Sequence, residues 1–229
     1  MVETLASGAE ARVTNRGAPR AVVCVNGGTG REVPGTWSAS LDWLVRRLAP
    51  EFPELAFAEV RYRIKSWKRL TWCIEDCRAA LELAEHDGAE EVALLGFSMG
   101  GAVAIAAADD PRVSTVIGLA PWIPDRLDLT SLDGRRVAIV HGALDRWLPG
   151  IPGVSTKSSL RGFERIRALG VEATHSILPG AVHGVAVRSR HSGLIPLPRA
   201  KSWAGLVAAE LSRFGARSGG ARPGSGRAA

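Results

Sequence analysis

The pentapeptide Gly96-Phe97-Ser98-Met99-Gly100 stands between two segments of different character. Residues 91–95 form a short apolar run that predicts a buried strand, and residues 101–108 form an alanine-rich run that predicts a helix. A tight turn between them leaves no room for a large side chain two positions before or after the serine, which explains the two outer glycines. The pattern therefore predicts that Ser98 lies in a strained turn with its hydroxyl exposed.

A G-x-S-x-G pattern between a strand and a helix is typical of a nucleophile elbow. The N-terminus of the following helix favours negative charge that develops close to the serine. A plain Gly/Ser turn between a strand and a helix is the alternative interpretation, because the bare pattern also arises by chance. The strand–turn–helix context favours the nucleophile elbow at Ser98.

Two later segments supply an acid and a base. Residues 136–140 predict another buried strand, and the segment His141-Gly142-Ala143-Leu144-Asp145 that follows places an aspartate just past its end. Residues 173–180 predict a last strand and turn, after which His183 follows. The chain order is therefore Ser98, Asp145 and His183, and each of the three side chains comes at the end of a predicted strand.

The rest of the chain continues this alternation of strands and helices. Apolar runs predict further strands at 21–25, 55–60 and 113–119, and helical spacing predicts helices at 41–48, 72–84, 160–169 and 203–214. Such alternation predicts an α/β domain whose mainly parallel sheet is covered by helices on both faces. In sheets of this kind ligands bind at the carboxyl ends of the strands, where all three candidate residues lie.

These motifs and their order resemble the α/β-hydrolase superfamily over about residues 20–214. The resemblance implies a single-domain fold with a sheet of about seven or eight strands. It also implies that Ser98 is the nucleophile, that His183 takes its proton, and that Asp145 orients the imidazole. The stretch between Trp122 and Arg135 is too short for a folded cap domain, so we expect an uncapped site similar to those of compact, dienelactone-hydrolase-like proteins.

Other residues compete for two of these roles. His191 is the main rival of His183, although no predicted strand and turn precede it. The alternatives for the acid are Asp125, Asp128 and Asp133, of which Asp128 fits an acid borne by the loop of the preceding strand. We interpret His141 as a residue that positions the Asp145 loop.

An oxyanion hole needs two backbone N–H groups aimed at the developing charge. One is expected from Met99, directly after the serine. The other is expected from the loop Asn26-Gly27-Gly28-Thr29, which resembles the His-Gly-Gly turn of the family with asparagine in place of histidine. We predict Gly28 as this donor, with Thr29 as the second choice.

Aromatic and basic residues follow the same strand ends. Trp37, Trp67, Trp122 and Trp147 fall in loops on the active-site side. They predict an aromatic-lined crevice for an apolar acyl or aryl group, although they could equally seal the loops onto the core. Arg61, Arg63, Lys65 and Lys68 could attract an anionic substrate, but we interpret them as a solvated face.

Composition excludes several classes of function. The net charge of +6 falls to +3 without Arg217, Arg222 and Arg227, and no basic cluster with interleaved aromatics predicts nucleic-acid binding. Three cysteines fit a reduced compartment, and their spacing does not complete a metal site. Val33 and Pro34 exclude a dinucleotide-binding turn after Gly28 and Gly30, so no cofactor is expected.

Targeting and domain organisation follow from similar observations. No apolar run reaches the length of ~18 residues that a membrane span needs, and the start has no apolar region of a secretory signal, so we expect a cytoplasmic protein. We expect an N-terminal edge segment at 1–19, the α/β-hydrolase domain at 20–214, and a disordered Gly/Arg-rich tail at 215–229.

The sequence as a whole predicts a serine hydrolase that cleaves a small carboxylic ester or thioester through an acyl-enzyme. Two alternatives remain open. One is a ligand-binding protein that keeps the fold with little or no turnover, and the other is an acyltransferase. The resemblance implies the catalytic class and leaves the substrate undetermined, because one fold hosts many activities.

Overall fold

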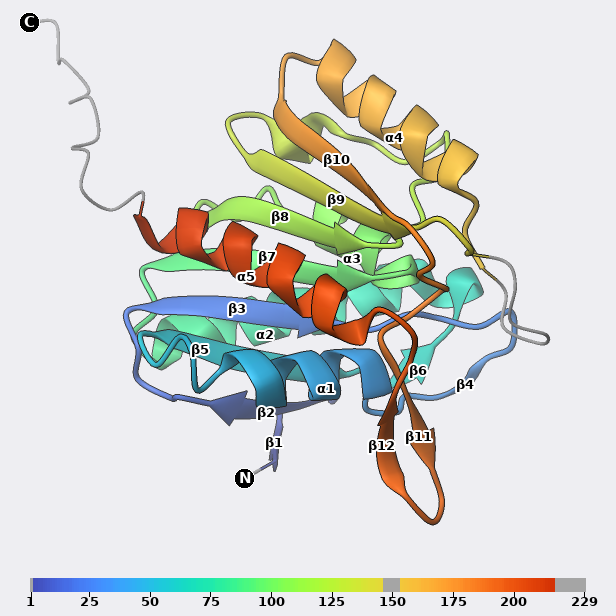
Figure 1. The fold of residues 1–229 in the computed structure, drawn as a ribbon. Coiled ribbons are helices and arrows are strands. Elements are labelled where there is room, and N and C mark those ends of the chain that lie inside the picture. Colours follow the sequence, from blue (N-terminus) through green and yellow to red (C-terminus); the bar gives the residue numbers. More distant parts are fainter. Residues whose placement is uncertain (1, 146–152, 217–229) are drawn as a thin grey trace, which may run out of the picture.

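A computed structural model describes residues 2–145 and 153–216 of the chain. Its centre is an eight-stranded sheet (Figure 1). The strands are, in order across the sheet, β1 (Val2–Thr4), β2 (Glu10–Thr14), β5 (Leu55–Arg61), β3 (Arg20–Val25), β7 (Glu91–Phe97), β8 (Val113–Leu119), β9 (Arg136–Gly142) and β10 (Glu172–Leu178). The six strands from β5 to β10 run parallel, and β1 and β2 join the β5 edge in antiparallel pairs.

The central strands are mostly apolar on both of their faces because helices cover both faces of the sheet. In β3 every residue after Arg20 is buried, and in β9 all seven residues are buried. The sheet therefore divides the interior into two hydrophobic layers. The predicted fold class, a single α/β domain with a mainly parallel sheet and helices on both faces, is confirmed.

Three helices cover one face of the sheet and two cover the other (Figure 1). The first layer holds α2 (Leu70–His86), α3 (Met99–Ala106) and α4 (Thr156–Ala168). The second layer holds α1 (Ala39–Leu48) and α5 (Ala200–Ala216), and Trp203 and Phe214 of α5 are completely buried there. The helix predicted at 41–48 begins two residues earlier because Ser38 caps its N-terminus and accepts a hydrogen bond from Leu41 N.

Several short elements were not predicted from the sequence. The strands β4 (Val33–Pro34) and β6 (Ile64–Lys65) form a small antiparallel pair beside the loop after β3. The strands β11 (Ala186–Ser189) and β12 (Gly193–Pro196) form a hairpin after the loop that carries His183. Between Trp122 and Arg135 the chain forms only the 3₁₀ turn η2 (Thr130–Leu132), as expected for a domain without a cap.

The ends of the chain add two observations. Residues 215 and 216, predicted as the start of the tail, form the end of α5, and the rest of the predicted tail, 217–229, lies outside the described residues. No helix in the described part of the chain has the length and apolar character needed to cross a membrane.

Candidate active site

Ser98 lies at the sharp turn between β7 and α3. Its backbone angles are φ 55° and ψ −117°, a left-handed conformation that is unfavourable for a residue with a side chain. The turn is held by hydrogen bonds at both ends of the residue: Ser98 N donates to Leu119 O at 2.9 Å, and Ser98 O accepts from Trp122 N at 2.8 Å. The surrounding backbone therefore fixes the strained conformation that the pentapeptide predicted.

The two glycines that flank the serine make this turn possible. A Cβ atom on Gly96 would overlap the carbonyl oxygen of Gly100, and a Cβ atom on Gly100 would overlap the carbonyl oxygen of Val25. Both clashes are with backbone, which cannot move aside as a flexible side chain can. Glycine at these positions is therefore required by the close approach of β7, α3 and β3.

Asp145 and His183 come together beyond the ends of β9 and β10. His183 Nδ1 lies 2.7 Å from Asp145 Oδ2, and both side chains are buried. The two loops are tied by backbone hydrogen bonds, from Ala143 N to Leu178 O at 3.0 Å and from Leu144 N to Ala181 O at 2.8 Å. The adjacency of β9 and β10 in the sheet thus brings together two residues that lie 38 positions apart.

A second histidine contacts the same carboxylate. His141 Nε2 lies 2.9 Å from Asp145 Oδ2 and 2.8 Å from the carbonyl oxygen of Val154. The other carboxylate oxygen, Oδ1, accepts a hydrogen bond from Val154 N at 3.1 Å. His141 therefore holds the Asp145 carboxylate directly, whereas the sequence had suggested only that it positions the loop.

This environment keeps the Asp145 carboxyl ionised. Burial by itself would raise its pKa, but the hydrogen bonds and electrostatic interactions with His141 and His183 together outweigh burial, and the pKa lies below its ordinary value. An ionised carboxylate only accepts hydrogen bonds, so Nδ1 of His183 carries the proton. Nε2 of His183 is then the lone-pair nitrogen, as a general base requires.

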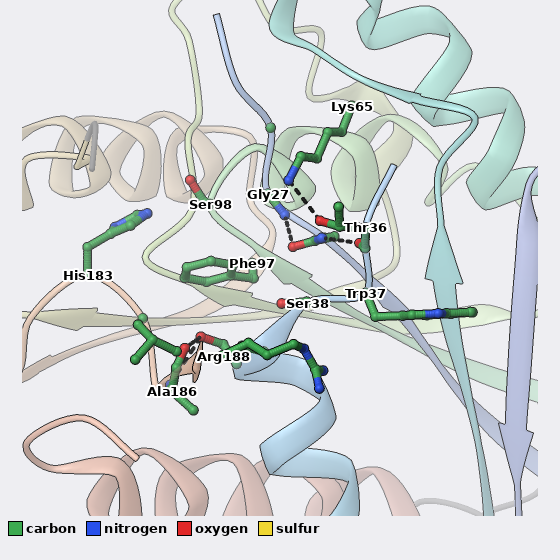
Figure 2. A pocket seen from close by; sticks show the side chains of 16 residues that line it. Gly27, Thr36, Trp37, Ser38, Lys65, Phe97, Ser98, His183, Ala186 and Arg188 are labelled. Atoms are coloured by element: carbon green, nitrogen blue, oxygen red, sulfur yellow. Dashed lines mark hydrogen bonds between the residues drawn. The ribbon is translucent and has the colours of Figure 1, made fainter. Parts of the chain in front are cut away.

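Ser98 and His183 line one cavity of about 320 Å³. Figure 2 shows the His183 imidazole directed toward the side of the cavity where Ser98 lies. No hydrogen bond joins the Ser98 hydroxyl to His183. In proteins without a bound substrate such contacts are often long and tighten on binding.

The loop after β3 approaches the serine from the opposite side. Asn26 anchors it: Asn26 Nδ2 donates to Thr36 O at 2.9 Å, and Asn26 Oδ1 accepts from Gly27 N at 2.7 Å. The Gly27 N–H is therefore engaged. Within the described residues no backbone hydrogen bond engages the N–H of Gly28 or of Met99, and a Cβ atom on Gly28 would overlap the Met99 side chain.

The other predicted loop donor, Thr29, forms hydrogen bonds within its own loop and to Trp67. Its hydroxyl donates to Arg31 O at 2.7 Å, its carbonyl oxygen accepts from Trp67 N at 3.0 Å, and it is not among the residues that line the cavity. Asn26, which stands where the family's turn has histidine, thus anchors this loop. The Thr29 N–H, like those of Gly28 and Met99, takes part in no hydrogen bond within the described residues, and of the two loop donors Gly28 is the one that lines the cavity.

The tryptophans predicted at the site fall in different places. Trp37 lines the main cavity, and its ring also lies under the guanidinium of Arg12. Trp67 and Trp122 line a smaller cavity of about 140 Å³ on another side of Ser98, with their ring centroids 6.4 Å apart. Trp147 lies outside the described residues.

The rival residues lie elsewhere. His191 is an exposed residue in the turn of the β11–β12 hairpin. Asp128 is exposed and accepts a hydrogen bond from Thr130 N at 2.9 Å, and neither Asp125 nor Asp133 lines the cavity. In the part of the chain that the structure describes, His183 is the histidine on the cavity wall and Asp145 the carboxylate that it contacts.

Solved structures of other proteins share this architecture. An alpha-beta serine hydrolase homologue from Coxiella burnetii superimposes with a TM-score of 0.65 at 19% identity, over 92% of this chain and 96% of that chain. An alpha/beta hydrolase from a Medee basin deep-sea metagenome library gives a TM-score of 0.68 at 16% identity, over 93% and 97%. An esterase from Pyrobaculum calidifontis gives 0.64 at 16% identity, over 94% and 84%.

The chain has the α/β-hydrolase fold. This conclusion concerns the fold alone, because all three identities are low. No family model and no curated protein sequence matches the chain. The resemblance that the elbow motif and the order of the three candidate residues suggested is thereby confirmed at the level of the fold.

Two charged residues of the main cavity belong to no sequence motif. Lys65, at the end of β6, lines the main cavity and was grouped in the sequence with Arg61, Arg63 and Lys68 as a solvated face. Arg188, on β11, lines the same cavity and was not singled out. The sequence shows Lys65 within a cluster of basic residues. Only the fold shows that Lys65 lines the cavity and that the other members of the cluster do not.

Proposed function

We propose that this chain is a serine hydrolase that cleaves a small carboxylic ester or thioester through an acyl-enzyme. The observation that carries the proposal is that His183, which contacts the buried Asp145 carboxylate, lines the same cavity as Ser98. The neighbours that are named esterase and serine hydrolase homologue support the same class of reaction.

The reaction proceeds in two halves. Ser98 Oγ attacks the carbonyl carbon of the ester while His183 Nε2 takes the hydroxyl proton. The bond from that carbon to the leaving oxygen or sulfur then breaks, and the leaving group receives the proton from Nε2. A water molecule repeats the attack on the acyl-enzyme, which releases the acid and returns the proton to Ser98.

The negative oxygen formed in each half needs donors that are in place beforehand. The backbone N–H groups of Met99 and Gly28 supply them, because their own hydrogen-bonding capacity is not used within the described chain. The N-terminus of α3 adds favourable electrostatic potential at the same point. Asp145 stabilises the imidazolium that exists while His183 holds the proton.

Covalent labelling and turnover test the proposal together. A fluorophosphonate probe is expected to label the wild-type protein at Ser98 and to leave the Ser98→Ala protein unlabelled. Turnover of short 4-nitrophenyl esters is expected to fall by a factor on the order of 10⁴ in Ser98→Ala. Undiminished ester turnover in Ser98→Ala contradicts the proposal, and a folded wild-type protein that neither labels nor turns over favours a binding protein.

A further inference from the structure

The charged side chains on the wall of the main cavity are all positive. Its charged lining residues are Lys65 and Arg188, and its described lining includes no Asp or Glu. Figure 2 shows these two side chains entering from opposite sides, with Thr36, Trp37 and Ser38 between them. Because the same cavity holds Ser98 and His183, any molecule that reacts there is exposed to the positive potential of both cations.

Lys65 is a cation without a carboxylate partner. Its Nζ donates to the hydroxyl of Thr36 at 2.8 Å, and no salt bridge joins it to any described residue. The undescribed ranges 146–152 and 217–229 contain neither Asp nor Glu. Partial burial keeps part of the solvent away from the Lys65 ammonium and lowers its pKa.

The two arginines that precede Lys65 in the sequence are paired. Arg61 forms a salt bridge with Glu10, and Arg63 Nε lies 2.7 Å from Asp76 Oδ1. These pairs stabilise the β2–β5 edge and the start of α2 and leave little net charge there. Lys65 differs from both because it faces the cavity and has only a hydroxyl as its partner.

Arg188 is compensated only in part. Its Nη2 lies 2.6 Å from Asp42 Oδ2, but the same buried carboxylate also binds Arg12 at 3.0 Å and Arg46 at 2.6 Å. Three guanidinium groups thus share Asp42. Within the described residues this cluster contains one further carboxylate, Glu59, which pairs with Arg12. The cluster holds Arg188 in place at the cavity and keeps an excess of positive charge.

We propose that the cavity binds esters or thioesters that carry a carboxylate, and that Lys65, supported by Arg188, is the site for this anion. The inference rests on the proposed function of Ser98, and it adds the class of substrate. A carboxylate would give the Lys65 ammonium the partner that it lacks. The cavity volume of about 320 Å³ lies at the lower end of the range for small-molecule sites, which suits a small substrate.

Paired substrates test this preference. In one pair the anion is on the acyl side, mono-4-nitrophenyl glutarate against 4-nitrophenyl valerate. In the other pair it is on the alcohol side, 4-acetoxybenzoate against 4-acetoxybenzamide. For at least one pair we expect the wild-type protein to favour the anionic ester, and Lys65→Met to lower the anionic-to-neutral ratio of kcat/KM by about tenfold. Lys65→Arg should keep most of the ratio.

The matched control is Lys68→Met, which removes an exposed lysine outside the cavity and should leave the ratio within about twofold of wild type. The ratio is used because a general loss of activity affects both members of a pair equally. The proposal is overturned if Lys65→Met leaves the ratio unchanged for both pairs, or if it changes no more than in Lys68→Met.

A binding measurement separates this proposal from the proposed function. Calorimetry with the Ser98→Ala protein is expected to show tighter binding of 4-acetoxybenzoate, or of the glutarate monoester, than of its neutral counterpart, and Lys65→Met should abolish the difference. Equal binding overturns the anion site even where fluorophosphonate labels Ser98. Selective binding without labelling of the wild-type protein keeps the anion site and rejects the hydrolase.

Discussion

His141 Nε2 and Asp145 Oδ2 lie 2.9 Å apart, and the same oxygen lies 2.7 Å from His183 Nδ1. Two imidazoles thus meet one carboxylate oxygen, one of them completely buried and the other at the cavity. His141 Nε2 also lies near the carbonyl oxygen of Val154, so this nitrogen carries the proton toward two acceptors. His141 in this way links Val154, in the loop that follows residues 146–152, to Asp145, the acid of the proposed triad.

Removal of this second imidazole is expected to destabilise the protein. His141→Phe leaves Val154 O without its donor and deprives the buried Asp145 carboxylate of one of its hydrogen bonds, which should cost about 1–3 kcal/mol of unfolding free energy. His141→Gln retains an N–H donor and should lose less. Urea denaturation measures both, with His86→Phe as the control, because His86 is exposed at the end of α2. Equal midpoints for His141→Phe and His86→Phe would contradict the role of His141.

The lowered pKa of Asp145 makes part of the stability depend on pH. The folded protein favours the ionised carboxylate, so the stabilisation is fully present above the ordinary carboxyl pKa of 3.8 and is lost as pH falls through the lower folded value. The difference in unfolding free energy between wild type and Asp145→Asn should therefore shrink as the pH falls below about 4. Denaturation of both proteins across this range measures it. A difference that grows toward low pH would show that the pKa is raised instead.

The glycines of the elbow are expected to tolerate no side chain. Gly96→Ala and Gly100→Ala each place a Cβ atom against backbone carbonyl oxygens, so each should destabilise the fold by about 3 kcal/mol or more. Gly205→Ala is the matched control, because Gly205 lies in α5 with no atom near the added Cβ and should gain about 0.5–1 kcal/mol. Thermal unfolding of the three variants decides this, and an elbow variant as stable as Gly205→Ala would refute the steric argument.

The elements that the sequence predicted best are those whose signal is local. The strand at 113–119 was predicted with the bounds of β8, because most of its residues are apolar and six of its seven residues are buried. The elbow at Ser98 was equally clear, since its two glycines, strand and helix lie within a few residues of each other. The family resemblance then supplied the order of Asp145 and His183.

What the sequence left out depends on contacts between distant positions. The β11–β12 hairpin was missed because its strands are four residues long and Arg188 interrupts the apolar pattern. Arg188 is held at the cavity by Asp42, which lies 146 positions earlier. Lys65 could not be told from Arg61 and Arg63 because their acidic partners lie on other elements. Local patterns thus predicted the strands and turns that carry Ser98, Asp145 and His183, whereas the charge of the cavity could be seen only in the fold.

The anion preference should itself depend on pH. Lys65 binds a carboxylate through its ammonium, so the preference is present below the Lys65 pKa and lost above it. Partial burial lowers that pKa, and the loss should therefore begin below the ordinary lysine value of 10.5. The ratio of kcat/KM for anionic and neutral esters reports the free enzyme, in which no bound carboxylate raises the pKa again. In Lys65→Arg the guanidinium stays charged, and the ratio should remain constant over the same range. A wild-type ratio that stays constant to pH ~10.5, after subtraction of spontaneous hydrolysis, would mean that another group than Lys65 recognises the anion.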